Sequence, residues 1–411
     1  MLWFKDGDRN TAFFHAVVKR RNNSSGIHRL RIDNVVIEDP KLIEEHILDF
    51  YKTLYAESIS HDLDIDNMED FIGTYIPAMV SSEENMMLIK CPDFSEINNV
   101  VFNLNGNSAP GPDGFGGVFY HSCWEIIGTD VCNVVQQFFK QNWVLPGMNS
   151  NVVSLIPKVQ GADSIKDYRP IVVANFKFKI ISKILVDRLA LVAARIISPN
   201  QYGFVQGRQI QDCIGIASEA INMLSKKVRG GNVAYKVDIH KAFDTLSWKF
   251  LLLVLTRFGF HPSFVGWIST ILRSAMLSIR ISGSLVGFFP CSRGVRQGDP
   301  LSPLLFCLAE EVLSRGLSKL VNDKKILHMA SPQGYLTPSH ILYVDDIFVF
   351  CRADNKSLRN LSIFLKIMVI FLVNMLITLK VVFSPWIILQ DLSPKFNVFF
   401  LVVMVVCLSI I

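Results

Sequence analysis

Two adjacent aspartates stand between two apolar runs in the C-terminal third of the sequence. In "SHILYVDDIFVFCR", residues 340–344 and 347–350 have the composition of buried strands, and Asp345 and Asp346 fall at the turn between them. Two neighbouring ionised carboxylates repel each other and lose hydration unless a positive partner is near. Asp also suits an ordinary solvated turn. The pair therefore predicts either a plain hairpin tip or a cation-binding site.

A third aspartate follows a strand-like run earlier in the chain. In "NVAYKVDIHKAF" apolar residues alternate from Val233 to Ile239, so Asp238 projects from the opposite face near the end of the predicted strand. Alone, it fits an exposed residue of an edge strand. One carboxylate from a strand end and two from a hairpin tip can, however, hold two divalent cations about 3.5–4 Å apart. Such a pair activates an attacking hydroxyl and neutralises a triphosphate, and hard oxygen ligands favour Mg²⁺.

A loop with two glycines precedes a predicted helix in "SRGVRQGDPLSPLLFCLAEEVLSRGL". Ser302 and Pro303 fit the N-cap and the first position of that helix, which carries an apolar stripe. In the loop, Gly298 lets the backbone approach a ligand closely, and Gln297 can hydrogen-bond a base or a sugar. As structure alone, the same segment is simply the entry to a helix.

Other segments specify shape or charge. Residues 40–104 have a mostly helical pattern, and "GNSAPGPDGFGG" (residues 106–117) holds five glycines and two prolines, which predicts a shaped loop. "NFKFKIISK" (residues 175–183) interleaves bases with aromatic residues, as a stacking groove or an amphipathic helix would. A basic cluster that could follow phosphates or form a solvated surface comprises Lys19, Arg20, Arg21, Arg29 and Arg31.

Composition favours a globular intracellular protein. The 411 residues are 50% hydrophobic and 19% charged, and the net charge of +5 permits a nucleic-acid partner without requiring one. The eight cysteines include no C-x-x-C pair, and the N-terminus has no apolar signal-peptide core. We therefore expect a reducing compartment, either the nucleus or the cytoplasm. No obligate protein partner is evident.

Five motifs occur in one order along the chain, and together they resemble the reverse transcriptases of plant LINE-type (non-LTR) retrotransposons. The motifs are "SAPGPDGF", "SLIPKVQGADSIKDYRPI", "KVDIHKAFD", "RGVRQGDPLSPLLF" and "YVDD". The opening "LWFKDGDRNTAFFH" is similar to the stretch before the polymerase in those polyproteins, so the resemblance covers residues 1–365. An intron-encoded maturase would share the aspartates but is expected to lack the first motif and this opening stretch.

The resemblance assigns catalytic roles by position. It makes Asp238, Asp345 and Asp346 the metal-binding catalytic aspartates, with two Mg²⁺ ions as cofactor and Mn²⁺ as a substitute. Phe243 matches the bulky gate that excludes a ribose 2′-hydroxyl, although it could also be a core residue. Val344 stands where many members of the family have Ala, a tolerable departure.

The resemblance also assigns nucleotide-contacting residues. Lys158 and Arg169 match basic residues that lie over the incoming triphosphate, although either could be an ordinary surface charge. Gln297 and Gly298 match the loop that contacts the nucleotide and the template. These residues, with the aspartates, form the expected active site.

The implied fold is α+β, a polymerase right hand with an antiparallel palm sheet bearing the aspartates and with mostly helical fingers. We expect a basic, helical segment at residues 1–95, fingers at 96–232 and the palm at 233–364. The implied activity is RNA-directed DNA polymerisation, which joins dNTPs to the 3′-hydroxyl of a DNA primer on an RNA template. A catalytically inactive retrotransposon relic with residual nucleic-acid binding is the alternative.

The resemblance fails after the hairpin. Asn374 and Lys380 stand at about the spacing of a family Asn and a family Lys that is thought to protonate pyrophosphate, but the preceding glycine turn is missing. Residues 365–411 form an apolar tail ending in "NVFFLVVMVVCLSII", which is short for a membrane-spanning helix. We expect a degenerate or C-terminally truncated copy with a missing or malformed thumb, rather than a protein with a membrane anchor.

Overall fold

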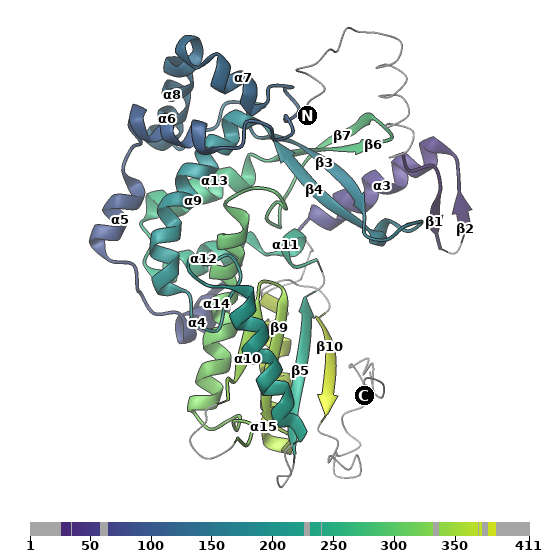
Figure 1. Ribbon diagram of the computed structural model, residues 1–411, viewed down its shortest axis with the longest axis vertical. Coiled ribbons are helices and arrows are strands. Elements are labelled where there is room, and N and C mark those ends of the chain that lie inside the picture. Colours follow the sequence, from purple (N-terminus) through teal and green to yellow (C-terminus); the bar gives the residue numbers. More distant parts are fainter. Residues whose placement is uncertain are drawn as a thin grey trace.

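A computed structural model of the chain shows a mixed α/β protein (Figure 1). It describes residues 26–33, 35–57, 65–225, 231–239, 241–331, 337–368, 370–371 and 377–383, without the side chains of residues 65, 66, 238 and 377–383. Within this part of the chain the strands form one sheet of two strands and two sheets of four. Lys19, Arg20 and Arg21 of the basic cluster lie outside the described residues.

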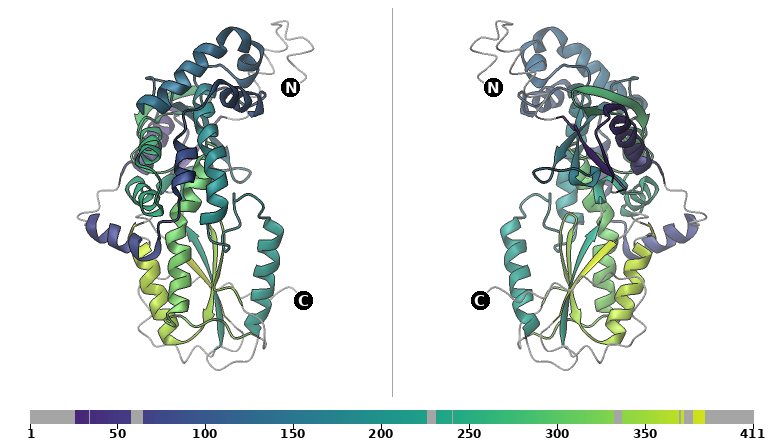
Figure 2. Two further views of the ribbon diagram at one scale, coloured as in Figure 1. Left: turned by 90° about the vertical axis from the view of Figure 1, so that its left-hand side faces the viewer. Right: turned by 90° about the vertical axis from the view of Figure 1, so that its right-hand side faces the viewer.

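The sheet that carries the predicted aspartates is antiparallel throughout, in the order β10-β5-β9-β8. Its strands are β5 (Asn232–Ile239), β8 (His340–Tyr343), β9 (Asp346–Arg352) and β10 (Ile377–Phe383). One face is covered by α10 (Ile210–Asn222), and the other by α14 (Ser302–Asn322) and α15 (Asn355–Met368) (Figure 2). The antiparallel sheet predicted from the sequence is confirmed.

Alternating side chains define the two faces of this sheet. Val233 and Val237 join the main core with Val349, whereas Ala234 packs with Phe350 in a smaller cluster beneath α10. A one-residue slip would exchange these two sets, because side chains on a strand alternate between faces. The period-two pattern of "NVAYKVDI" therefore excludes a one-residue slip of β5 within the sheet.

A second sheet lies at the other end of the molecule, in the order β4-β3-β6-β7, with β3 and β6 parallel. Its strands are β3 (Ser150–Pro157), β4 (Tyr168–Ala174), β6 (Met276–Ile281) and β7 (Ser284–Pro290). Helix α3 (Pro40–Tyr55) packs on it through Ile43 and Ile47. The hairpin of β1 (Leu30–Ile32) and β2 (Val35–Ile37) lies beside α3 (Figure 1).

Further helices surround the main core, as the pattern of residues 40–104 predicts for the first of them. They are α4 (Ile65–Tyr75), α5 (Ser82–Ile89), α6 (Phe94–Asn103), α7 (Gly117–Ser122), α8 (Trp124–Gln141), α9 (Phe176–Ile196), α11 (Ala242–Thr245), α12 (Trp248–Phe258) and α13 (Pro262–Arg273), with 3-10 turns at Ile165–Asp167 and Met223–Ser225. In α9, Phe176 and Phe178 are buried, so "NFKFKIISK" is a core helix and not a stacking groove.

Helix α14 begins one residue earlier than the sequence suggests. Its N-cap position is Leu301, so the prediction that Ser302 is the cap was wrong. Asp299 takes this role: its side chain accepts a hydrogen bond from Leu301 N (3.0 Å), and its carbonyl accepts one from Ser302 N (3.2 Å). An Asp side chain binds backbone amides two residues on as readily as Ser does.

Part of the apolar tail joins the fold. Leu365 and Met368 are buried in α15, and β10 pairs with β5 from Ile377 opposite Ile239 to Phe383 opposite Val233. Packing thus continues past the expected boundary at 365. Asn374 and residues 384–411 lie outside the described residues. Of the helices that the structure describes, none is long and apolar enough to cross a membrane.

Candidate active site

The aspartate pair lies at the tip of the β8–β9 hairpin, as the sequence predicts. Strand β8 ends at Tyr343, β9 begins at Asp346, and Val344 and Asp345 form the turn. Both aspartates are exposed. The hairpin therefore presents two carboxylates to solvent at one end of the sheet.

Asp238 is the register partner of Asp346 in the neighbouring strand β5. On the other side of β5, Asp238 pairs with Thr378 of β10. Paired positions are the nearest neighbours across a sheet. The backbone register alone therefore brings the three aspartate positions to one end of the sheet.

A lysine compensates part of the negative charge at this end. Lys236 Nζ lies 2.8 Å from Asp346 Oδ1 and 5.9 Å from the centre of the Phe348 ring. Among the side chains that the structure describes, no three His, Cys, Asp or Glu residues form a metal site; the side chain of Asp238 is not among them. The carboxylate donors at the tip suit a hard divalent cation, which completes its shell with water and substrate phosphates.

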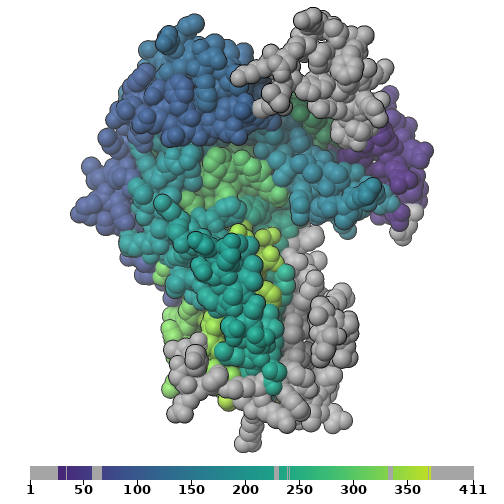
Figure 3. Space-filling view, in the orientation of Figure 1, coloured from purple at the N-terminus to yellow at the C-terminus, as the bar shows by residue number. Residues whose placement is uncertain are grey.

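A cavity of about 580 Å³ opens beside the hairpin tip. The space-filling view shows this face recessed between the hairpin and the β3–β4 pair (Figure 3). The cavity wall includes Asp345 and all five residues predicted to contact the nucleotide, namely Lys158, Arg169, Phe243, Gln297 and Gly298. These residues come from separate segments of the chain, so only the fold brings them together.

Two cationic side chains lie where the β3–β4 pair meets the cavity. Lys158 directly follows β3, and Arg169 belongs to β4, where it pairs with Ile156. Both are exposed, and Lys158 Nζ donates a hydrogen bond to the carbonyl of Lys166 (2.8 Å). Two such cations at the cavity wall can make charge-assisted hydrogen bonds to phosphate oxygens.

Phe243 is both a packing residue and part of the cavity wall. Its ring stacks on Phe306 of α14, with ring centres 4.7 Å apart and an angle of 20° between the rings. Phe306 is fully buried, whereas Phe243 is partly exposed to the cavity. The two roles considered for Phe243 are therefore compatible, because core packing holds its ring at the wall.

The loop before α14 is fastened to β4 and to α11. Gln297 O accepts a hydrogen bond from Val172 N (2.8 Å), and Gln297 Nε2 donates one to Asp244 Oδ2 (3.0 Å). Gly298 has a φ of +114°, and a Cβ there would lie 2.5 Å from Val172 O. Only glycine fits this combination of backbone conformation and close approach.

Asp244 and Lys241 also line this cavity, although the sequence analysis did not name them as candidates. Asp244 Oδ1 accepts a hydrogen bond from Tyr55 OH of α3 (3.1 Å). Burial raises the pKa of Asp244 to about 6, against the opposing effects of its hydrogen bonds and of Lys241. Burial likewise lowers the pKa of Lys241 to about 8, and its Nζ lies 4.0 Å from the centre of the Phe50 ring. Their place in "KAFD", on either side of Phe243, was the available signal.

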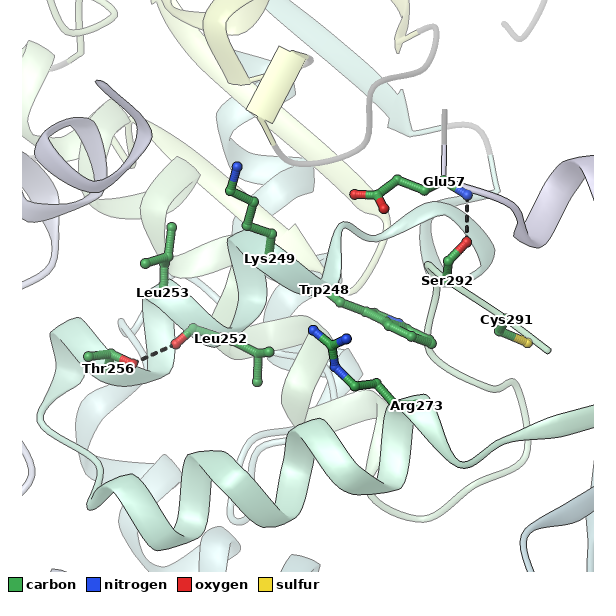
Figure 4. A pocket seen from close by; sticks show the side chains of 9 residues that line it. All are labelled: Glu57, Trp248, Lys249, Leu252, Leu253, Thr256, Arg273, Cys291 and Ser292. Atoms are coloured by element: carbon green, nitrogen blue, oxygen red, sulfur yellow. Dashed lines mark hydrogen bonds between the residues drawn. The ribbon is translucent and has the colours of Figure 1, made fainter. Parts of the chain in front are cut away.

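A second cavity, of about 590 Å³, contains no predicted site residue. It lies along α12 and α13, where Arg273 points toward the indole of Trp248 (Figure 4). Glu57 N donates a hydrogen bond to Ser292 Oγ (2.6 Å) at its edge. The cavity that contains the predicted site residues is therefore the first one.

Comparisons with known proteins show the family to which this chain is similar. A family model described as reverse transcriptase (RNA-dependent DNA polymerase) matches residues 156–379, more than half of the chain and a segment that contains every predicted site residue. Similar proteins include the transposon TX1 uncharacterized 149 kDa protein of Xenopus laevis, 31% identical over 310 residues, or 74% of this chain and 23% of the relative. The retrovirus-related Pol polyprotein from type-2 retrotransposable element R2DM of Drosophila melanogaster is 29% identical over 197 residues, or 48% of this chain and 18% of the relative.

A third relative, the retrovirus-related Pol polyprotein from type-1 retrotransposable element R2 of Nasonia vitripennis, is 28% identical over 162 residues, or 39% of this chain and 16% of the relative. The chain thus spans less than a quarter of the length of each of these relatives. The match to the family model nevertheless covers the hairpin, the strand of Asp238 and the cavity walls. The chain belongs to the reverse transcriptase (RNA-dependent DNA polymerase) family.

Proposed function

We propose that the chain is an RNA-directed DNA polymerase of the non-LTR retrotransposon type, which joins dNTPs to the 3′-hydroxyl of a DNA primer on an RNA template. The observation that carries the proposal is the cavity, whose wall combines Asp345 with all five predicted nucleotide-contacting residues. Cations on one wall and carboxylates on another suit a nucleoside triphosphate. The retrotransposon relatives support the class, and the order of the motifs supports the plant LINE type.

In this proposal Asp238, Asp345 and Asp346 would hold two Mg²⁺ ions, or Mn²⁺ in their place, and these ions would lower the pKa of the primer hydroxyl and neutralise charge on the leaving pyrophosphate. Lys158 and Arg169 bind the triphosphate. These roles are typical of enzymes that transfer phosphoryl groups, because catalysis there consists mainly of positioning and electrostatic stabilisation.

The remaining residues act on the nucleoside. Gln297 and Gly298 contact the base pair from a loop that Asp244 and β4 fasten. Phe243, held by Phe306, occupies the space of a ribose 2′-hydroxyl and so selects deoxynucleotides. The sheet of β5, β8 and β9 is then the palm within residues 233–364, and residues 96–232 form the fingers. A missing or malformed thumb, a degenerate tail and a nuclear or cytoplasmic location remain predictions.

Primer extension with purified protein tests the substrate class. We expect extension of oligo(dT) on poly(rA) with Mg²⁺ and dTTP, and much weaker extension with UTP. A matched oligo(dT) on poly(dA) reports the preference for an RNA template. If the protein is folded, as judged by circular dichroism, and extends the primer on neither template, the proposal is overturned and the inactive relic becomes the better description.

A further inference from the structure

A short segment before α10 extends the catalytic sheet beside β8. Leu342 N donates a hydrogen bond to Asn200 O (2.8 Å), and Tyr202 N donates one to Leu342 O (2.9 Å), so Gln201 and Leu342 form a parallel bridge. Arg208 donates hydrogen bonds to the carbonyls of Gln201 and Ser198. Residues 200–203 are thus fixed against the strand that leads into the aspartate turn.

The side chain of Gln201 holds the backbone of that turn. Gln201 is 1% exposed, and its Oε1 accepts hydrogen bonds from Val344 N (3.1 Å) and from Gly203 N (2.8 Å). Its Nε2 donates to Oε2 of Glu310 (2.8 Å), a buried residue of α14. All three hydrogen bonds of this amide go to defined partners, which fixes its orientation.

Val344 needs such support because its backbone conformation is unfavourable. Its φ is +57°, in the left-handed region, where a β-branched residue is rare. Its side chain is buried against Gly203: a Cβ at Gly203 would lie 2.4 Å from Val344 Cγ2. The next two residues, Asp345 and Asp346, repel each other. The turn therefore combines backbone strain with charge repulsion, and the hydrogen bond from Val344 N to Gln201 Oε1 holds its backbone in place.

We infer that Gln201, oriented by Glu310, is a positioning residue that holds Val344 in its left-handed conformation and so sets where Asp345 and Asp346 stand relative to Asp238. The inference rests on the proposed function, because it concerns the geometry of the same metal-binding turn. Gln201 is buried and its amide is hydrogen-bonded to protein groups, so we assign it no contact with substrate or with the reacting atoms. It acts through one backbone amide.

The test compares Gln201→Leu with Asn232→Leu as a matched control. Asn232 is also fully buried, and its side chain makes three hydrogen bonds, to Met223 O, Ala330 O and Ala330 N, at the far end of β5 from Asp238. We expect Gln201→Leu to lower kcat by about 10–100-fold, with the KM for primer–template unchanged, because a small misplacement of reacting groups costs about that much. Asn232→Leu should lower stability without this loss of kcat.

Two further variants separate positioning from simple burial. Glu310→Gln keeps a carbonyl acceptor for Gln201 Nε2, so its kcat should stay close to that of the wild type. When Val344→Gly is added to Gln201→Leu, the double variant should regain much of the kcat that Gln201→Leu loses, because glycine adopts the left-handed conformation without support. Equal loss of kcat in Gln201→Leu and Asn232→Leu, or no recovery with Val344→Gly, would overturn the inference.

Hydrogen exchange provides a readout that needs no activity. In Gln201→Leu the peptide covering residues 340–347 should exchange about tenfold faster, because the Val344 amide has lost its acceptor. The same peptide should be unchanged in Asn232→Leu. Absence of primer extension by the wild type would count against the polymerase proposal, whereas unchanged exchange in Gln201→Leu would count against the role of Gln201.

Discussion

Asp244 is a buried carboxylate that connects three distant segments of the chain. Its two oxygens accept hydrogen bonds from Tyr55 of α3 and from Gln297 of the loop before α14. Burial raises the pKa of Asp244 to about 6, although the charge of Lys241, three residues earlier, opposes this shift. The protonation state of Asp244 is therefore coupled to the packing of the cavity wall.

Replacing Asp244 should change how stability depends on pH. The pKa of about 6 exceeds the usual value of 3.8, so the folded protein keeps a proton that the unfolded chain releases. This stabilisation is fully present below about pH 4 and is lost as the pH rises through about 6. In Asp244→Asn, the fall in unfolding free energy between about pH 4 and about pH 7 should shrink by up to about 3 kcal/mol. Urea unfolding at both pH values measures this change. If the stability of Asp244→Asn depends on pH as strongly as that of the wild type and of an exposed Asp130→Asn control, the account is contradicted.

Replacing Phe243 should weaken sugar selection. Phe243→Ala opens the space next to the stacked ring of Phe306, and the ratio of kcat/KM for dTTP to that for UTP should fall about tenfold or more. Phe243→Tyr keeps the ring and should keep the ratio. Steady-state extension with each nucleotide gives both values. If Phe243→Ala selects as strongly as the wild type, Phe243 is only a packing residue.

The conformation of the loop at residues 296–299 depends on one glycine, Gly298. Arg296 Nη2 and Asp299 Oδ2 form a buried ion pair (2.6 Å), and Arg296 lies over the Phe178 ring at 4.8 Å. The loop is therefore rigid on both sides of Gly298. A side chain at Gly298 would meet the backbone of β4 and not a movable group.

Replacing Gly298 should displace this loop. Gly298→Ala combines a φ of +114° with a Cβ 2.5 Å from Val172 O, so we expect a loss of about 1–3 kcal/mol in unfolding free energy and a raised KM for dTTP. Gly215→Ala, in open space on α10, should be neutral or slightly stabilising. Thermal melts and steady-state kinetics of the two variants provide the comparison. Gly298→Ala with wild-type stability and KM would refute the close approach.

Elements with local signals could be predicted from the sequence. The β8–β9 hairpin follows from its two apolar runs, β5 follows from the alternation of apolar residues, and the buried stripe of α14 follows from helical spacing. The predicted start of α14 was wrong because Asp299, which lies outside the helix, caps its first turn in place of Ser302. In α9 the basic and aromatic residues did not reveal that the rings are buried, since burial depends on neighbours from other segments.

Helix α3 ties the N-terminal part of the described chain to the active site. Its buried face packs on the second sheet, its Tyr55 reaches Asp244, and Arg293 Nε donates to Leu54 O (2.8 Å). This helix lies before the residues matched by the family model. Residues outside the five sequence motifs therefore help to support the cavity.

Weakening the packing of α3 should destabilise the protein as a whole. Ile47 is fully buried, so Ile47→Ala should cost about 2–5 kcal/mol of unfolding free energy. Leu42 on the same helix is 50% exposed, and Leu42→Ala should cost well under half of that. Chemical denaturation of both variants decides the matter. Equal, small effects would mean that α3 contributes little to the fold.

The resemblance of the motifs to a known family identified the residues of the candidate site but not the residues that support them. Lys158, Arg169, Phe243, Gln297 and Gly298 were named from the sequence, and the structure places all five at one cavity. The contributions of Tyr55, Gln201 and β10 were not foreseen. Each depends on a contact between residues far apart in the chain, for which one sequence carries no local pattern.

Single-nucleotide addition by aspartate variants tests the central claim most directly. The claim is that Asp238, Asp345 and Asp346 together form the metal-dependent centre of nucleotide addition. With oligo(dT) on poly(rA), dTTP and Mg²⁺, the wild type and Asp130→Asn should extend the primer, and Asp238→Asn and Asp345→Asn should each be slower by on the order of a thousandfold. Extension at the wild-type rate by either folded variant would contradict the claim.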